Sequence, residues 1–231
     1  MIGYAAVMHK QIIQKLDADG MFRFDGLWSP DEVAEAAFLV RAALADGLDG
    51  SGVRVFRPAE LAPRLRHLLT GGALARALER SIGPCDLLSV KPVVKDGGHG
   101  FATPWHQDRP YWGGCVKWSV WIALDRVDPG NGCLRVLRGS HTRDCGHHAG
   151  GDNHGFAHRA EVDERRAEDA VLAAGDALLF HDLLLHASHP CQAGRSRIAL
   201  IPTYRVRGIV DDSHLAKPDG LWAEPVAVEA A

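Results

Sequence analysis

The sequence predicts a mainly β fold with flanking helices, organised as one domain over residues 1–231. Eight short apolar segments separated by turn residues lie between about 86 and 207, a pattern typical of a β-sandwich or barrel. Helix signals precede them in a helical N-terminal part, about 1–85, and a tail, 208–231, follows. A chain of 231 residues fits one large domain.

The N-terminal part contains one well-marked helix start. Ser29 is followed by Pro30 and, three residues on, by Glu32, which together form a capping box with proline in the first turn. We expect this helix to end near Gly47. Other expected elements are a helix over 5–16, a strand over 21–27, and helices over 58–69 and 73–82.

The β part is divided by tight turns, for example at residues 129–132 and 174–176. The expected strands are 87–94, 104–111, 116–124, 133–137, 171–173, 177–180, 184–187 and 197–206. Residues 142–169 have little apolar content and are expected to form a long loop. Its histidines favour a solvated loop over a second metal site; they are His147, His148, His154 and His158.

The composition limits the kinds of partner and the cellular location that we expect. A net charge of −3 gives no reason to expect nucleic acid or a membrane surface. No apolar run reaches the ~18 residues that a membrane span needs, and the N-terminus lacks a signal-peptide pattern. Five scattered cysteines argue against a disulfide framework and a structural zinc site. We therefore expect a cytoplasmic protein with a small-molecule substrate; no feature indicates its oligomeric state.

The chemistry centres on residues 104–112, where His106 and Asp108 stand two residues apart between aromatic residues. If this segment is extended, both side chains point to one face and Gln107 points to the other. An imidazole and a carboxylate provide two ligands of the site that binds non-heme iron, two histidines and one carboxylate. His186 is the best candidate for the third, and Arg197 follows eleven residues later.

This order of residues, together with residues 121–125 and 131–141, resembles the phytanoyl-CoA dioxygenase family of iron(II)- and 2-oxoglutarate-dependent oxygenases. The resemblance covers about half the chain, 87–204. It implies a jelly-roll core (a cupin-like double-stranded β-helix), iron(II) held by His106, Asp108 and His186, and 2-oxoglutarate and O₂ as co-substrates. Related halogenases carry a small residue where Asp108 stands, so the carboxylate favours oxygenation.

Arg197 is expected to hold the distal carboxylate of 2-oxoglutarate, because a guanidinium binds a carboxylate through two hydrogen bonds. Arg195, two residues earlier, is the competing choice, although the family spacing favours Arg197. The resemblance adds three co-substrate contacts: Lys91, Trp121 and Ser188. Each has an ordinary alternative, namely a solvated lysine, a core tryptophan and a loop serine.

The pocket for the second substrate is less defined. Gln107, Arg109, Tyr111 and Trp112 flank the metal motif, and His99 lies on a loop before it. The aromatic residues favour an apolar or ring-bearing substrate unless they only pack in the core, and Arg109 could hold an anionic group. No adenine-binding signature indicates a coenzyme A thioester, so a small free metabolite is expected.

The predicted function is that of a dioxygenase that hydroxylates a C–H bond of a metabolite and releases succinate and CO₂. Two alternatives remain open from the sequence. One is a non-catalytic jelly-roll protein that binds or senses a ligand. The other is a cupin-like metal enzyme that does not use 2-oxoglutarate.

Overall fold

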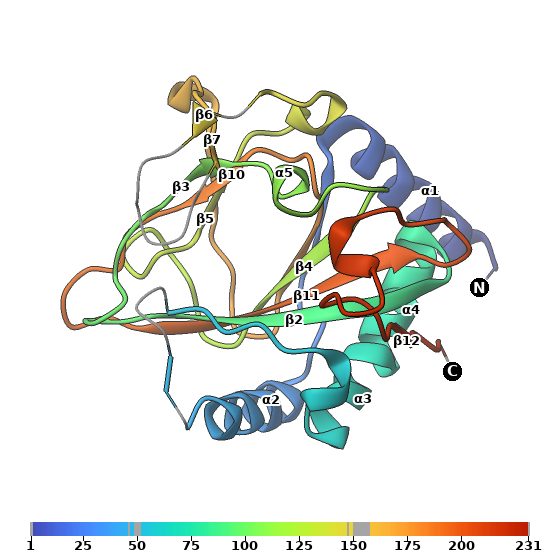
Figure 1. Cartoon of the computed structure of the whole chain (residues 1–231), viewed down its shortest axis with the longest axis horizontal. Coiled ribbons are helices and arrows are strands. Elements are labelled where there is room, and N and C mark those ends of the chain that lie inside the picture. Colours follow the sequence, from blue (N-terminus) through green and yellow to red (C-terminus); the bar gives the residue numbers. More distant parts are fainter. Residues whose placement is uncertain (1, 46, 49–51, 147, 150–157, 231) are drawn as a thin grey trace.

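The structure is a computed structural model that describes residues 2–45, 47–48, 52–146, 148–149 and 158–230. Two antiparallel sheets form a jelly-roll, as predicted, and helices cover the outer face of the larger one (Figure 1). The larger sheet has the strand order β1-β9-β4-β11-β2-β12. The smaller sheet has the order β3-β10-β5-β8, and β6 (His148–Ala149) pairs with β7 (His158–Arg159).

The larger sheet is built around its two longest strands, β2 and β11, which pair over ten registered positions. Its apolar residues alternate between the helix layer and the interior of the jelly-roll, as the two-residue period of a strand requires. Its strands are β1 (Met21–Phe24), β2 (Cys85–Lys95), β4 (Trp118–Ala123), β9 (Ala177–His181), β11 (Arg197–Val206) and β12 (Val226–Ala227). Bridges from Val53 to Val93 and from Phe56 to Val90 lie along β2.

The smaller sheet consists of β3 (Thr103–His106), β10 (His186–Ser188), β5 (Leu134–Val136) and β8 (Glu168–Ala170). Strand β10 lies between β3 and β5, and His186 is the direct register partner of His106. The segment expected as a strand over 171–173 is instead β8, displaced towards the N-terminus. The expected loop 142–169 contains short elements, although His147 and His154 lie outside the described residues.

The helices are α1 (Ile2–Asp19), α2 (Pro30–Ala43), α3 (Pro63–Thr70) and α4 (Gly72–Ile82), with short 3₁₀ turns elsewhere. The capping box predicted before α2 is present: Ser29 Oγ accepts from the Glu32 N–H, and the Glu32 carboxylate accepts from the Ser29 N–H. Helix residues and the sheet share one apolar cluster that includes Val40, Leu69 and Leu200. The single helix expected over 58–69 is divided into η1 (Pro58–Glu60) and α3.

The extended segment predicted over 104–111 is the main error in the sequence-based elements. Strand β3 ends at His106, and Asp108 has helical backbone angles, φ −76° and ψ −34°, at the start of the short helix α5 (Arg109–Trp112). The proline at 110 suits the first turn of a helix. His106 and Asp108 therefore converge through a strand-to-helix turn and not through the alternation of a strand.

The C-terminal segment, residues 208–230, packs against the jelly-roll (Figure 1). It contains η4 (His214–Ala216) and ends in β12, which pairs with Leu87 and Asp86 of β2. Within the described residues no helix is both long and apolar enough to cross a bilayer.

Candidate metal centre

His106, Asp108 and His186 come together in the structure, with potential ligand atoms all within 4.8 Å of one another. The distance from His106 Nε2 to Asp108 Oδ1 is 3.7 Å, and from His186 Nε2 to the same oxygen 4.0 Å. All three residues are buried. Two imidazoles and one carboxylate on one side of a metal leave the other positions open, as in non-heme iron(II) sites.

The backbone fixes the tautomers of both histidines. His106 Nδ1 lies 2.9 Å from the Pro104 carbonyl, and His186 Nδ1 lies 2.9 Å from the Leu184 carbonyl. Since a carbonyl only accepts, each Nδ1 carries the proton and each Nε2 presents a lone pair towards Asp108. Burial, reinforced by the nearby His186, lowers the pKa of His106 to about 3, so its ring is neutral at physiological pH. The rings are thus prepared for metal binding.

Asp108 is the only acid of the three. Burial acts to raise its pKa, but Lys91 and the two histidines outweigh this effect, and the pKa of Asp108 is lowered overall. Its carboxylate is therefore ionised at neutral pH. A buried anion requires a cation close by, and a bound divalent metal would supply one.

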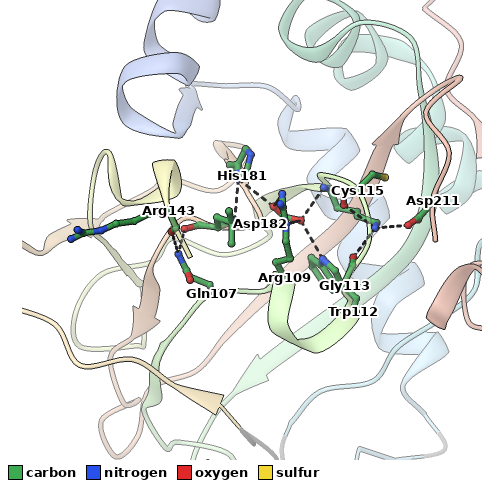
Figure 2. Close-up of polar contacts among 11 residues, drawn as sticks. Gln107, Arg109, Trp112, Gly113, Cys115, Arg143, His181, Asp182 and Asp211 are labelled. Atoms are coloured by element: carbon green, nitrogen blue, oxygen red, sulfur yellow. Dashed lines mark hydrogen bonds and ion pairs between the residues drawn. The ribbon is translucent and has the colours of Figure 1, made fainter. Parts of the chain in front are cut away.

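Asp182 contacts the turn that carries Asp108, although the sequence analysis did not single it out; Figure 2 shows the polar contacts of its side chain. Its backbone carbonyl accepts from the N–H groups of Asp108 and Arg109, at 2.8 and 3.1 Å. Its fully buried carboxylate accepts from the Arg109 guanidinium at 2.7 and 3.1 Å, from Trp112 Nε1 at 3.3 Å and from the Lys117 N–H at 3.0 Å. Asp182 thereby fixes the turn that carries Asp108.

Arg197 lies in the cavity beside the three potential ligands. Its side chain is buried, two of its nitrogens donate to the carbonyls of Val93 and Gly132, and its guanidinium carbon lies 5.3 Å from the centre of the Trp121 ring. Its Nε has no hydrogen-bond partner, and no carboxylate of the described chain forms an ion pair with it. Arg195, the competing choice, instead pairs with Asp128 at the surface.

Lys95 is a cavity residue that the sequence analysis missed. It is the register partner of Arg197, it is buried, and its Nζ donates to Ser188 Oγ at 2.8 Å and to the carbonyls of Phe101 and His189. Burial, together with the charge of Arg197, lowers the pKa of Lys95 to about 7. Its position four residues after Lys91 on the same face of β2 was the available signal.

Ser188 is held between Lys95 and the Thr103 N–H, which donates to Oγ at 3.2 Å. Because both contacts use the oxygen as an acceptor, the Ser188 hydroxyl proton is left to donate to a ligand. Lys91 also lines the cavity, and its charge helps to lower the pKa of Asp108 and of His106. The pKa of Lys95, by contrast, is lowered in part by the charge of Arg197.

The cavity that contains these residues has a volume of about 720 Å³, within the usual range for small-molecule sites. Tyr111 and Trp112 line it as expected, and Tyr111 packs edge-on against the His106 ring at 5.9 Å. Three residues of the C-terminal segment also line it, although no sequence pattern indicated them: Leu215, Leu221 and Trp222.

Three predicted substrate contacts lie outside this cavity. Gln107 is fully buried and its amide bonds to the Arg143 and Leu183 carbonyls and to the Cys145 N–H, as Figure 2 shows for Arg143. Arg109 is paired with Asp182. His99 bonds to Asp96 at 3.0 Å on its loop. Each of the three bonds to the protein itself, so the structure does not bring these predicted substrate contacts to the cavity wall.

A second group of potential ligands, Cys133, Asp169 and His189, also lies within 4.8 Å. Burial raises the pKa of Cys133 to about 12, so it is a neutral thiol, and Asp169 already pairs with His189 at 2.7 Å. We therefore interpret these three residues as packing and ion-pairing groups and not as metal ligands. The histidine-rich loop adds no described site: His147 and His154 lie outside the described residues, as do the side chains of His148 and His158.

The fold and this site define a class: jelly-roll proteins that hold a metal by two histidines and one carboxylate. Residues 16–199 match the family "Phytanoyl-CoA dioxygenase (PhyH)", and the chain belongs to that family. Its cofactors are accordingly iron(II), 2-oxoglutarate and dioxygen, and the donor set and the buried Arg197 fit them.

Among curated proteins, the chain is 35% identical to the peroxisomal phytanoyl-CoA dioxygenase of Bos taurus over 94 residues, 37% of this chain and 28% of that protein. Among solved structures, it resembles the non-heme α-ketoglutarate-dependent epimerase SnoN from nogalamycin biosynthesis, with a TM-score of 0.72, 20% identity, and coverage of 87% and 84% of the two chains. It also resembles the non-heme monooxygenase ThoJ, with a TM-score of 0.71, 23% identity, and coverage of 87% and 79%.

Replacing His186 by alanine should weaken Mn(II) binding by more than about 100-fold, because one of three protein ligands is lost. Calorimetric titration of Mn(II) measures this. His189→Ala, three residues away and outside the site, is the matched control and should bind as the wild type does. Equal affinities in His186→Ala and wild type would contradict the assignment.

The Asp182→Ala variant should lower the free energy of unfolding by about 3–5 kcal/mol, because it leaves buried donors, including the Arg109 guanidinium, without their acceptor. Urea unfolding measures the loss. Asp212→Ala, an exposed position, should change stability by less than about 0.5 kcal/mol. A loss below 1 kcal/mol in Asp182→Ala would contradict the supporting role of this carboxylate.

Lys95 should make 2-oxoglutarate binding depend on pH. With a lowered pKa of about 7, Lys95 loses its charge as the pH rises above 7, so the affinity for the dianion should fall and binding should take up a proton. Calorimetry at pH 8 in two buffers of different ionisation enthalpy measures this uptake. It should disappear in Lys95→Met and persist in the surface control Lys10→Met; unchanged uptake in Lys95→Met would exclude Lys95 as its source.

Proposed function

We propose that this protein is an iron(II)- and 2-oxoglutarate-dependent dioxygenase that hydroxylates a C–H bond of a small-molecule metabolite and releases succinate and CO₂. The observation that carries the proposal is the buried, unpaired guanidinium of Arg197 beside the three potential metal ligands. A buried cation without a counter-charge is costly, so it is typical of a site that receives an anion.

The residues have distinct parts in this reaction. His106, Asp108 and His186 would hold iron(II), which, with 2-oxoglutarate and dioxygen bound, supplies the oxidising power. The free N–H groups of Arg197, which packs on the Trp121 ring, and the Ser188 hydroxyl would bind the distal carboxylate of 2-oxoglutarate. Tyr111 and Trp112 form an apolar wall beside the histidines and keep water away from the reacting C–H bond.

The reaction type and location are also proposals. Structures with similar folds include an epimerase, a monooxygenase and a carbocyclase, so proteins of this fold carry out several reactions. We propose hydroxylation because this reaction needs no catalytic group beyond the metal ligands and the co-substrate-binding residues named above. The described cysteines are all free thiols, which suits a cytoplasmic protein.

Succinate release that depends on 2-oxoglutarate and iron tests this function, with a panel of candidate metabolites. His106→Ala and Asp108→Ala should abolish it, since each removes a metal ligand. Arg197→Gln should weaken 2-oxoglutarate binding by about 1.5–3 kcal/mol, which is roughly 10- to 150-fold. Arg195→Gln is the control.

The outcomes separate the alternatives. Tight binding of 2-oxoglutarate with no succinate from any substrate would favour a binding or sensing protein. Metal-dependent activity that is indifferent to Arg197→Gln would favour a cupin-like enzyme that uses no 2-oxo acid. Succinate release that persists in both His106→Ala and Asp108→Ala would contradict the assignment of these residues as metal ligands.

A further inference from the structure

The long loop over residues 142–169 contacts the metal-ligand motif from the side that faces away from the cavity. His106 and Asp108 line the cavity, whereas their neighbours Trp105 and Gln107 do not. Successive residues of a strand point to opposite faces, so Trp105 points away from the metal site. Trp105 and Gln107 are nevertheless both buried, and β7 lies beside β3 in this region (Figure 1).

Trp105 joins β3 to the later part of the loop. Its carbonyl accepts from the Ala160 N–H at 2.8 Å, and its Nε1 donates to the Glu164 carboxylate at 3.2 Å. Arg135 of β5 pairs with the same carboxylate at 2.7 Å, and its guanidinium carbon lies 5.4 Å from the centre of the Trp105 ring. A backbone hydrogen bond, an indole hydrogen bond and a cation on the ring thus hold residues 160–164 against β3.

Gln107 joins the same motif to the earlier part of the loop. Its Nε2 donates to the Arg143 carbonyl at 2.9 Å, and its Oε1 accepts from the Cys145 N–H at 3.0 Å (Figure 2 shows Gln107 beside Arg143). The same Nε2 donates to the Leu183 carbonyl at 2.6 Å, in the segment that leads to His186. Because a buried amide is costly unless its hydrogen bonds are made, these contacts with two other segments depend on one another.

These contacts restrain the metal ligands relative to one another. Gln107 stands between the first two ligands in the chain, and Leu183 stands three residues before the third, His186. The bond between them ties the two ligand-bearing segments together, next to the bond from the Asp108 N–H to the Asp182 carbonyl. Site residues must be held to within about 0.5 Å for function, so groups that restrain β3 from outside affect metal affinity.

We propose that residues 143–145 and 160–164, here called the outer clamp, position the metal ligands through Gln107 and Trp105. The outer clamp holds β3 and the turn after it against the segment that carries His186. Gln107 and Trp105 are positioning residues, since neither lines the cavity. The proposal rests on the proposed function and gives the long loop a role at the same site.

Gln107→Met tests the outer clamp, because methionine has nearly the same length as glutamine and makes none of the three hydrogen bonds. Mn(II) affinity, measured by calorimetry, should fall by about tenfold or more. Tyr204→Phe is the matched control, since it also removes a buried hydrogen bond to a backbone carbonyl, that of Leu69 at 2.8 Å. It should lower the free energy of unfolding but leave Mn(II) affinity within about twofold of wild type.

The outcomes separate this proposal from the proposed function. Wild-type Mn(II) affinity in Gln107→Met would overturn the outer clamp, even in a less stable variant, because the amide would then only support the fold. That result would leave the proposed function unchanged. A wild type that binds no Mn(II) would contradict both proposals, whereas a wild type that binds Mn(II) but releases no succinate would contradict the proposed function alone.

A second measurement needs no variant. Coupling between two sites is reciprocal, so a metal that is bound more tightly because of the outer clamp must also stabilise it. Hydrogen exchange at the Cys145 and Ala160 amides, which donate to Gln107 and Trp105, should slow by about threefold or more when Zn(II) is bound. The Ala45 amide, at the end of α2, is the control and should exchange at an unchanged rate. Equal exchange at Cys145 and Ala160 with and without Zn(II) would overturn the outer clamp.

Discussion

The site depends on the antiparallel pairing of β3 with β10, which places His106 directly opposite His186. Facing positions of paired strands are the closest that two side chains on different strands can be, and here the ring centroids are 4.1 Å apart. Each ring is fixed by a carbonyl two residues before it. A shift of one residue in this register would turn one imidazole out of the cavity, so the chemistry depends on how the smaller sheet is aligned.

Charge is distributed unevenly around the cavity, and this imbalance is the second constraint. Three cations line it, Lys91, Lys95 and Arg197, and Asp108 is the acid that lines it among the described residues. Lys95 is neutralised in part by burial, and Lys91 is partly exposed, but Arg197 remains charged, since even its lowered pKa is about 10. A dianionic co-substrate would restore the balance, and the fold bears the cost of the cations until it binds.

Two kinds of feature were predicted from the sequence: local secondary-structure signals, and site residues that belong to a recognisable motif. The capping box at Ser29, the strand 197–206 and the residues that form the triad are in the structure as expected. The path to Asp108 was wrong because Pro110 favours a helical turn, which outweighs the period of a strand. Lys95, Asp182 and Trp222 could not be recognised, since their roles arise from contacts with residues 93, 73 and 133 positions away. Long-range packing of this kind leaves no local pattern.

Strand β2 would form an open border of the larger sheet if two other segments did not cover it. Residues 53–56 bridge to one part of it and β12 to another. Unpaired strand borders attract the strands of other molecules and lead to aggregation. Shortening the chain before residue 226 would uncover the backbone groups of Leu87 and Asp86 in this way, so the last residues protect the protein from self-association as well as closing its fold.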